Sequence, residues 1–397
     1  MTKERIIKAN PKYIQHFQKG FPLLNKENVT SSIENIEEGE ILKLVDNNNG
    51  FIAKGYSGIQ NKGVGWLLSW KEQEAIDKDF ILKKLQAAIN QRLHFYYSED
   101  TTAFRVFNGE GDGFGGIIID YFDGYYLVQW YSKGAYAFKQ EVMQGLRELT
   151  DYKGIYQKKR FAQEGKYVEE DDFVEGTRPS FPLLVKENGV QFAIYLNDGA
   201  MVGVFLDQRE VRKRIRDSYS EGKRVLNTFS YTGAFSVFAA LGGALETTSV
   251  DLANRSLSKT IEQFSINGID YEAQNIIVED VFKYFKYAVK KELSFDLVIL
   301  DPPSFARSKK HTFSAAKDYK DLLKEAIAIT EKKGTIVAST NCSTFNMKKF
   351  KSFIETAFKE TNGKYKILEE YTLPEDFKTL SQYKQSDYLK VAFIQKL

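Results

Sequence analysis

The chain has 397 residues, more than a typical single domain, so two or three domains are expected. Its single cysteine excludes an internal disulfide framework and a thiolate metal cage, and its three histidines show no metal-ligand spacing, so no metal is expected. No apolar run has the length of a secretory signal or of a membrane span, which predicts a cytoplasmic protein with no membrane partner. The net charge of +3 is too mild to indicate nucleic-acid binding by itself.

Residues 1–72 contain short strand-like runs separated by turn signals. Apolar runs at 41–45 and 51–56 flank Asp46-Asn47-Asn48-Asn49-Gly50, and this pattern predicts a β-hairpin. We interpret the region as a small β-barrel. Helical spacing over about 72–95 then predicts the connection to a second unit.

Residues 73–190 read as a small α+β domain. Strand-like runs at 104–107 and 116–121 flank the Gly-rich stretch 108–113. Because this stretch lies between strands rather than before a helix, a tight turn is favoured over a phosphate-binding loop. Further elements are expected as strands at 125–130 and 154–157 and a helix over about 136–149.

From residue 191 to 397 the pattern changes. A hairpin of 190–196 with 203–206 is expected to lead into a basic helix over 208–218, after which strands alternate with helices. Such alternation predicts an α/β fold with a mostly parallel sheet and right-handed crossovers. The expected strands are 224–227, 248–251, 275–278, 295–300, 335–340 and 388–395.

Two of these strands are followed by residues that could take part in a reaction. The strand 295–300 runs into Asp301-Pro302-Pro303-Ser304, and the strand 335–340 is followed by Asn341-Cys342-Ser343. If the two strands are neighbours in a parallel sheet, the thiol and the Asp-Pro-Pro turn face one cleft. A thiolate beside a pocket for a planar base can add to a pyrimidine ring. The alternative for a lone cysteine is a small, buried apolar residue.

The Asp-Pro-Pro turn is suited to hold a base. Pro302 and Pro303 fix the backbone and remove amide hydrogens, so carbonyls near Ser304 could point into the cleft. Asp301 and these carbonyls match the exocyclic amine and ring nitrogen of a base, and Phe305 could stack on it. The alternative is a rigid turn with no ligand.

The earlier strand ends predict a cofactor site, because ligands of open α/β sheets lie beyond the carboxyl ends of the strands. The loop 227–236 is not a Gly-x-Gly-x-x-Gly motif, which disfavours a pyrophosphate. Asp251 could bind ribose hydroxyls and Asp280 an adenine amine, although either could instead be a helix N-cap. Together these features suggest S-adenosylmethionine. The candidate cofactor contacts are Asn227, Ser230, Tyr231, Thr232, Gly233, Asp251, Asp280, Val281 and Asp301.

The helix over 208–218 carries Arg209, Arg212, Lys213 and Arg216 on one face. This face could bind RNA phosphates or the cofactor region, and the alternative is a solvated surface. The candidate substrate contacts are Gln208, Arg209, Arg212, Pro302, Pro303, Ser304 and Phe305.

Taken together, these residues resemble the bacterial family of S-adenosylmethionine-dependent large-subunit (23S) ribosomal RNA cytosine-5 methyltransferases of the I type. The resemblance implies a PUA-like RNA-binding barrel over 1–72, a central α+β domain over 73–190 and a Rossmann-like methyltransferase domain over 191–397. The family's His-Pro-Trp segment appears here as Phe21-Pro22-Leu23. The matching pieces are 205–209, 227–236, Val250-Asp251, Asp280, 301–305, 341–343 and, in the central domain, 108–113.

The resemblance also implies a mechanism. The Cys342 thiolate would add to C6 of a cytosine, C5 would take the methyl group, a base would remove the C5 proton, and the thiolate would leave. Asp301 would hold the base and stabilise charge on its ring. Related enzymes often carry a second cysteine that assists release, whereas this chain has Ser304 after its two prolines. Ribosomal RNA is the expected partner, and a homodimer is one expectation for the oligomeric state.

Two rival functions stay open at this point. A related branch of methyltransferases modifies guanine at N7, shares the Asp-Pro-Pro region and needs no thiol. A non-catalytic RNA-binding assembly factor with an inherited cofactor pocket would bind the cofactor without turnover.

Overall fold

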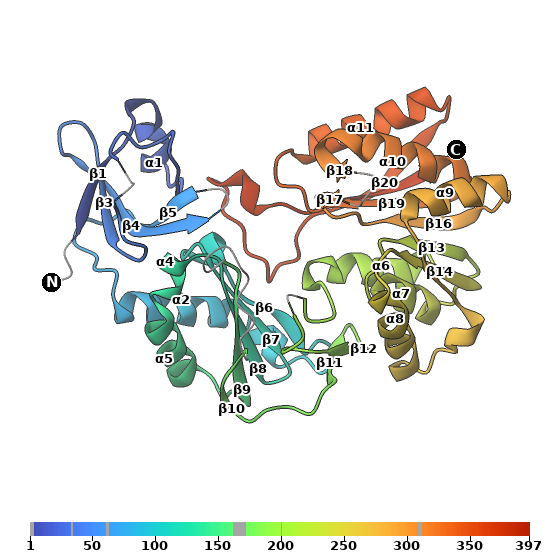
Figure 1. Ribbon diagram of the computed structural model, residues 1–397, viewed down its shortest axis with the longest axis horizontal. Helices are drawn as coiled ribbons and strands as arrows, with labels where there is room; N and C mark the ends of the chain where they lie inside the picture. The colour runs from blue at the N-terminus through green and yellow to red at the C-terminus, as the bar shows by residue number, and fades with distance from the viewer. Residues whose placement is uncertain (1–3, 33–34, 61–62, 162–171, 200, 308–311) are drawn as a thin grey trace. The chain divides into compact units, whose positions relative to one another are not determined.

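The computed structural model describes residues 4–32, 35–60, 63–161, 172–199, 201–307 and 312–397. The chain divides into two compact units, which are described separately below (Figure 1). Unit 1 comprises 1–185, 195–202 and 375–386, and unit 2 comprises 186–194, 203–374 and 387–397.

The N-terminal part of unit 1 is a five-stranded sheet with the order β1-β3-β4-β5-β2. The predicted hairpin is confirmed, since β3 and β4 pair antiparallel on either side of the Asn-rich turn. Its core includes Ile7, Phe17, Leu24 and Leu44, all buried. The elements are β1 (Arg5–Lys8), α1 (Ile14–Gln18), β2 (Leu23–Leu24), β3 (Ile41–Val45), β4 (Phe51–Gln60) and β5 (Gly63–Ser69).

The central part of unit 1 is a second five-stranded sheet with the order β10-β9-β8-β7-β6. Side chains alternate across it: Phe104 and Val106 on β6 pack with residues of α2 and α5 in one hydrophobic core, while Arg105 points to the opposite face. The Gly-rich stretch is a 3-10 turn at Gly109–Asp112, so the prediction of a tight turn is confirmed. The elements are α2 (Lys78–Gln91), α3 (Leu93–Tyr96), β6 (Ala103–Asn108), β7 (Ile117–Phe122), β8 (Tyr125–Trp130), α4 (Lys133–Tyr136), α5 (Lys139–Leu149), β9 (Gly154–Lys159) and β10 (Phe173–Gly176).

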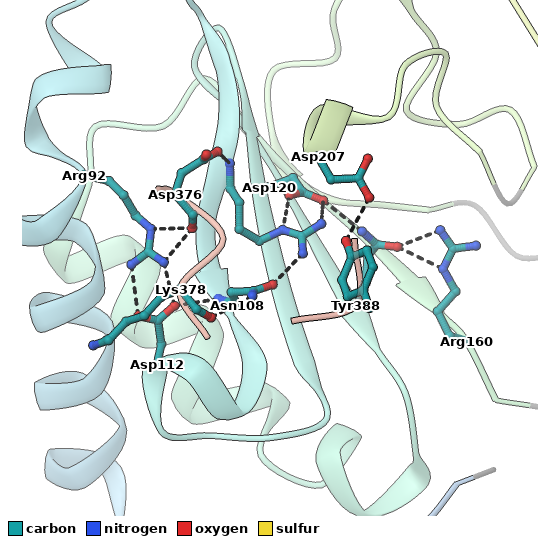
Figure 2. Close-up of polar contacts among 11 residues, drawn as sticks. Arg92, Asn108, Asp112, Asp120, Arg160, Asp207, Asp376, Lys378 and Tyr388 are labelled. Atoms are coloured by element: carbon teal, nitrogen blue, oxygen red, sulfur yellow. Dashed lines mark hydrogen bonds and ion pairs between the residues drawn. The ribbon is translucent and has the colours of Figure 1, made fainter. Parts of the chain in front are cut away.

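A row of polar side chains crosses the face of the central sheet opposite its helices (Figure 2). Arg105 on β6 donates from Nε to Asp120 Oδ1 at 2.6 Å, and Gln129 on β8 donates from Nε2 to Asp120 Oδ2 at 2.9 Å. Arg160, directly after β9, donates from Nε to Gln129 Oε1 at 2.9 Å. These bonds satisfy polar groups whose partial burial would otherwise be unfavourable.

The segment 375–386, which precedes the last strand in sequence, packs in unit 1. The carbonyl oxygen of Asp376 accepts a hydrogen bond from the Arg92 guanidinium at 2.7 Å (Figure 2). The carbonyl oxygen of Lys378 would lie only 1.8 Å from a Cβ atom at Gly111. Glycine is therefore required at position 111 for this close approach.

Unit 2 is built on a seven-stranded sheet with the order β15-β14-β13-β16-β19-β21-β20. The five strands from β15 to β19 are parallel, and β21 is antiparallel to both of its neighbours. The prediction of a mostly parallel sheet is confirmed. Its strands are β13 (Arg224–Thr228), β14 (Glu246–Asp251), β15 (Asn275–Val278), β16 (Phe295–Leu300), β19 (Thr330–Thr340), β20 (Tyr365–Tyr371) and β21 (Lys390–Lys396).

Helices cover both faces of this sheet (Figure 1). Leu297 and Ile299 of β16 pack with residues of α6 and α7, whereas Val298 and Leu300 pack with residues of α9, α10 and α11. This alternation buries the strand on both faces, which explains the apolar run from Leu297 to Leu300. The helices are α6 (Arg209–Ser218), α7 (Ala234–Leu241), α8 (Arg255–Ile266), α9 (Val281–Lys290), α10 (Ala315–Ile329) and α11 (Met347–Glu360).

One predicted hairpin is wrong. Strand β12 (Val190–Ile194) pairs with β11 (Leu183–Glu187), and residues 203–206 form no strand. The tight turn between β11 and β12 has Asn188 and Gly189 at positive φ, which is the turn chemistry of a short hairpin. A small pair of strands, β17 (Phe305–Arg307) and β18 (Thr312–Ser314), also follows the Asp-Pro-Pro turn.

Two features are absent from the ranges that the structure describes: a membrane-spanning helix and a cluster of metal-binding side chains. None of the helices in these ranges has the length and apolar character needed to cross a bilayer. In the same part of the chain, no group of three or more His, Cys, Asp or Glu side chains is placed to hold a metal ion.

Candidate active site

The two strand ends that carry Asp301 and Cys342 are neighbours. Strand β16 pairs parallel with β19, with Leu300 opposite Ala338, so the sequence-based condition that the two strands be neighbours is met. Asp301 follows β16 directly, and Cys342 lies two residues beyond the end of β19. Both residues therefore lie at the same edge of the sheet, beyond the carboxyl ends of adjacent strands, where open α/β sheets bind ligands.

Asp301 is held by a buried amide. Gln208 Nε2 donates to Asp301 Oδ1 at 3.0 Å and to Ser339 Oγ at 2.7 Å. The pKa of Asp301 is raised to about 6, chiefly by burial; the hydrogen bond with Ser339 opposes the rise, and the negative charge of Asp207 adds to it. A carboxyl group with this pKa can hold or release a proton near neutral pH, which suits it to contact a ring whose charge changes during a reaction.

Asp301→Asn is expected to change the pH dependence of the free energy of unfolding. The pKa of Asp301 is about 6 in the folded protein and ~3.9 in the unfolded chain, so protonation of this carboxyl favours folding. The stabilisation is fully present below pH ~4, and it is lost as pH rises through about 6. The shift corresponds to roughly 2–3 kcal/mol. Urea denaturation at several pH values should show the difference between wild type and variant changing by that amount from pH ~4 to ~7. Identical pH dependence in both proteins would contradict the assignment.

Cys342 is bound through its backbone and its side chain. Its amide donates to Thr340 Oγ1 at 3.2 Å, and its sulfur lies 3.1 Å from Thr344 Oγ1. Its carbonyl accepts from Lys390 Nζ at 2.9 Å. The side chain is 6 % exposed and packs in the hydrophobic core on the α10 side of the sheet. The thiol is thus fixed in place and only slightly open to solvent.

The loops that carry the two residues are joined by a hydrogen bond. Ser304 Oγ donates to Asn341 Oδ1 at 2.5 Å, which connects the turn after β16 to the turn after β19. In the Asp-Pro-Pro turn Pro302 is buried and Pro303 is exposed. Phe305 is 63 % exposed, as a ring that stacks on a base would have to be before the base binds.

Apart from Asp301, which follows β16, the predicted cofactor residues lie at or just beyond the ends of β13, β14 and β15, which are adjacent in the sheet. The loop after β13 has Phe229, Tyr231 and Gly233 at positive φ. The amide of Tyr231 donates to Asp251 Oδ2 at 2.9 Å, and the amide of Ser230 donates to the carbonyl of Val250 at 3.1 Å. The end of β14 therefore holds the loop in its turned conformation.

Some predicted cofactor residues already have structural partners. Asp280 is the N-cap of α9 and accepts from the amide of Lys283 at 3.2 Å, as the alternative interpretation anticipated. Val281, in the first turn of α9, is buried in the core. Thr232 Oγ1 donates to the carbonyl of Gly203 at 2.8 Å. Contact of these residues with a cofactor stays a prediction.

Asn227 differs, because part of its side chain is unsatisfied. Its Nδ2 donates to Ser236 Oγ at 3.0 Å, whereas its buried Oδ1 has no hydrogen-bond partner in the described part of the chain. Beside it, a Cβ atom at Gly233 would lie 2.5 Å from Thr260 Cγ2, so glycine lets the loop lie close against α8. A turned loop, two strand-end carboxylates and an orphaned amide oxygen fit a nucleoside ligand that carries amine and hydroxyl donors.

The structure corrects the interpretation of the basic helix. Arg209 and Arg212 are each only 1 % exposed, so they form neither an RNA-binding face nor a solvated face. Arg212 donates from Nε and Nη2 to the two carboxylate oxygens of the fully buried Glu187, both at 2.7 Å. Glu187 lies at the end of β11, and the chain gave no local signal of this pairing.

Sequence reasoning also missed partners at the catalytic edge. The Tyr388 hydroxyl donates to Asp207 Oδ2 at 2.9 Å, and the Tyr319 hydroxyl donates to the carbonyl of Ser339 at 2.6 Å. Burial raises the pKa of Tyr319 well above its usual value. Only Asp207 could have been found, because it directly precedes Gln208 in a motif already singled out.

The chain is similar to known methyltransferases over most of its length. Residues 105–381 match the model of an S-adenosylmethionine-dependent methyltransferase family, and residues 7–70 match a PUA-like domain. The YwbD protein of Bacillus subtilis (strain 168), provisionally named a ribosomal RNA large subunit methyltransferase, is 62% identical, with 96% of each chain covered. The ribosomal RNA large subunit methyltransferase I of Aeromonas salmonicida (strain A449) is 30% identical over 91% of this chain and 92% of its own.

A solved structure gives the same result. SMU.776, described as a methyltransferase complexed with SAH, is similar with a TM-score of 0.89 and 37% identity, and the match covers 99% of both chains. The fold is therefore Rossmann-like with an N-terminal PUA-like domain, and the cofactor is S-adenosylmethionine. The chain belongs to the family of S-adenosylmethionine-dependent methyltransferases that includes these ribosomal RNA large subunit enzymes.

Proposed function

We propose that this protein methylates C5 of a cytosine in large-subunit (23S) ribosomal RNA through a covalent adduct at Cys342. The names of its relatives supply the substrate class. The observation that carries the choice of base and mechanism is the placement of Cys342 and Asp301 beyond the ends of the paired strands β19 and β16. A thiol and a proton-holding carboxyl at one edge are the groups that nucleophilic activation of a pyrimidine requires.

In this proposal the thiolate of Cys342 attacks C6 of the cytosine and forms an S–C6 bond. The electron pair of the C5–C6 double bond moves into the ring, where Asp301 stabilises the charge by sharing its proton with the ring nitrogen. C5 thereby becomes nucleophilic and takes the methyl group that S-adenosylmethionine would supply, with S-adenosylhomocysteine as the leaving group. A base then removes the C5 proton, the C5–C6 double bond re-forms, the S–C6 bond breaks and the ring nitrogen returns its proton to Asp301.

The residues around these two groups have supporting roles. Gln208 holds the Asp301 carboxylate, and the Ser304–Asn341 hydrogen bond keeps the two turns together. Phe305 offers an exposed ring on which an unstacked base could lie. Because Arg212 is buried against Glu187, we assign it to positioning of α6, which begins directly after Gln208, rather than to contact with RNA.

The cofactor would be held by the loop 230–233 together with Asp251, Asp280 and Asn227. The unsatisfied Asn227 Oδ1 can accept from a donor on the ligand, and Asp251 can accept from ribose hydroxyls.

One observation favours a second candidate. Cys342 is largely buried in an apolar core, as a passive cysteine would be. In that case the same site could methylate N7 of a guanine, which needs no thiol, or bind cofactor without turnover.

The identity of the product decides between the candidates. Unmodified large-subunit ribosomal RNA is incubated with the protein and labelled S-adenosylmethionine, then digested to nucleosides for mass spectrometry. We expect 5-methylcytidine. We also expect RNA that contains 5-fluorocytidine to form a stable adduct with the protein. Because C5 then carries fluorine in place of the proton that the base would remove, the thiol cannot be eliminated. A product of 7-methylguanosine, or no product and no adduct, would overturn the proposal.

A further inference from the structure

We propose that Lys390 is a positioning residue that holds Cys342 in the orientation needed for attack, an inference that rests on the proposed function. Lys390 is the first residue of β21 and lies opposite Thr340 in the antiparallel pairing with β19. It is 4 % exposed, and it is followed on β21 by the fully buried Val391, Ala392 and Phe393. Lysine is rarely buried without specific partners, so its presence here calls for a reason.

The partners of the Lys390 amino group point to that reason. Nζ donates to the carbonyl of Cys342 at 2.9 Å and to the carbonyl of Tyr388 at 2.7 Å, and it lies 5.5 Å from the centre of the Phe345 ring. Burial raises the pKa of Asp387 nearby, and the positive charge of Lys390 opposes this rise. Both Cys342 and Phe345 belong to the loop after β19, so Lys390 contacts that loop at two points.

Cys342 is consequently restrained at three positions: Thr340 binds its amide, Lys390 its carbonyl and Thr344 its sulfur. The first comes from Thr340, the last residue of β19, and the third from Thr344 in the same loop. Of these three hydrogen-bond contacts, the one with Lys390 connects Cys342 to a different strand. Removing it would loosen the attachment of the loop to β21 while leaving the thiol chemically intact.

The segment from Asp387 to Lys390 contacts residues that hold Asp301 and also the loop that carries Cys342. The Tyr388 hydroxyl donates to Asp207 at 2.9 Å, next to Gln208, which binds Asp301. Lys390, two residues later, binds the peptide of Cys342. One short segment therefore helps to fix the positions of the Cys342 thiol and the Asp301 carboxyl relative to each other. Fixing reacting groups in this way pre-organises a site for its reaction.

The chain offers a matched control at the other end of the same strand. Lys396 also donates to two carbonyl oxygens, those of Ile327 at 2.8 Å and Thr330 at 2.6 Å. Burial lowers the pKa of Lys396. Lys396→Met therefore removes a comparable pair of hydrogen bonds from β21 without touching the loop that carries Cys342.

The test compares Lys390→Met with Lys396→Met in the full-length protein. For Lys390→Met we expect kcat to fall about 10–100-fold, with unchanged KM for S-adenosylmethionine, because misplacement of a reacting group by ~1 Å has an effect of that order. Because Cys342 is the only cysteine, alkylation by iodoacetamide reports on it alone. We expect its alkylation to become several-fold faster, since a released loop exposes the sulfur. Lys396→Met should change neither rate.

Each other outcome has a defined meaning. The inference is overturned if Lys390→Met leaves kcat and alkylation within two-fold of wild type, if alkylation is unchanged while kcat falls, or if Lys396→Met has the same effects. Should Lys390→Met fail to fold, Lys390→Gln keeps a donor at this position and should give a smaller change in the same two rates. Alkylation does not depend on the methylated base, so a guanine product would overturn the proposed function while the placement of Cys342 by Lys390 is tested separately.

Discussion

Replacement of Cys342 by alanine should reduce methyl transfer by on the order of 10³-fold or more, while binding of SAH stays within two-fold of wild type. The reason is that the chain contains a single cysteine, so the variant has no thiol that could form the bond to C6. Without that bond, C5 of a cytosine is not nucleophilic enough to accept the methyl group. Single-turnover transfer of labelled methyl, together with calorimetric titration of SAH, measures both quantities.

Two further variants make this test specific. Cys342→Ser keeps a small polar group and should be as inactive as the alanine variant, because a hydroxyl is a far weaker nucleophile than a thiolate at neutral pH. Ser343→Ala changes the adjacent residue of the same loop and should retain activity. If Cys342→Ala transfers methyl groups at a rate within about ten-fold of wild type, the covalent mechanism is wrong. Loss of a nucleophile would lower the rate by much more than that.

The second large effect concerns stability. Arg212→Met is expected to reduce the free energy of unfolding by about 3–5 kcal/mol, because it leaves the carboxylate of Glu187 buried without its bidentate partner. The double variant Arg212→Met, Glu187→Met should recover most of that loss, since two apolar side chains replace the ion pair. Urea denaturation followed by far-ultraviolet circular dichroism measures the three proteins.

A surface ion pair on the same helix serves as the control. Arg214 forms a 2.7 Å ion pair with Glu369, but its side chain is 42% exposed. Arg214→Met should therefore lower the free energy of unfolding by less than ~1 kcal/mol. Tryptophan fluorescence reports on the unfolding of unit 1, which contains all three tryptophans of the chain, Trp66, Trp70 and Trp130. Arg212 belongs to unit 2, so the two signals distinguish the two units. A loss for Arg212→Met no greater than that for Arg214→Met would contradict the role assigned to the buried pair.

Much of unit 2 could be predicted from sequence, for a physical reason. Central parallel strands are buried on both faces, so 224–227, 248–251 and 295–300 stand out as apolar or β-branched runs separated by helices. The sequence also placed Asp301 and Cys342 just beyond strand ends, and it made their facing each other conditional on the two strands being neighbours. The pairing of β16 with β19 meets that condition.

What could not be predicted depends on contacts between distant residues. Strand β20 (Tyr365–Tyr371) has a mixed polar sequence because it is the edge strand of the sheet, and it was missed. The basic character of α6 suggested a surface, whereas Glu187 from a separate hairpin draws Arg212 into the interior. Nothing in the sequence distinguishes Lys390 within the expected strand 388–395, and only the three-dimensional structure shows that it binds the carbonyl of Cys342.

The place of 375–386 in the chain has a consequence for biosynthesis. Most residues of unit 1 have been made once the ribosome reaches position 185. Unit 1 also includes the segment 375–386, whose last residue is made 201 residues later (386 minus 185). At typical elongation rates of about 5–20 residues per second, this interval lasts roughly 10–40 s. During it, Arg92 lacks the carbonyl of Asp376, and the surface at Gly111 lacks its neighbour Lys378. Unit 1 can therefore reach its final form only after residues 375–386 have been made.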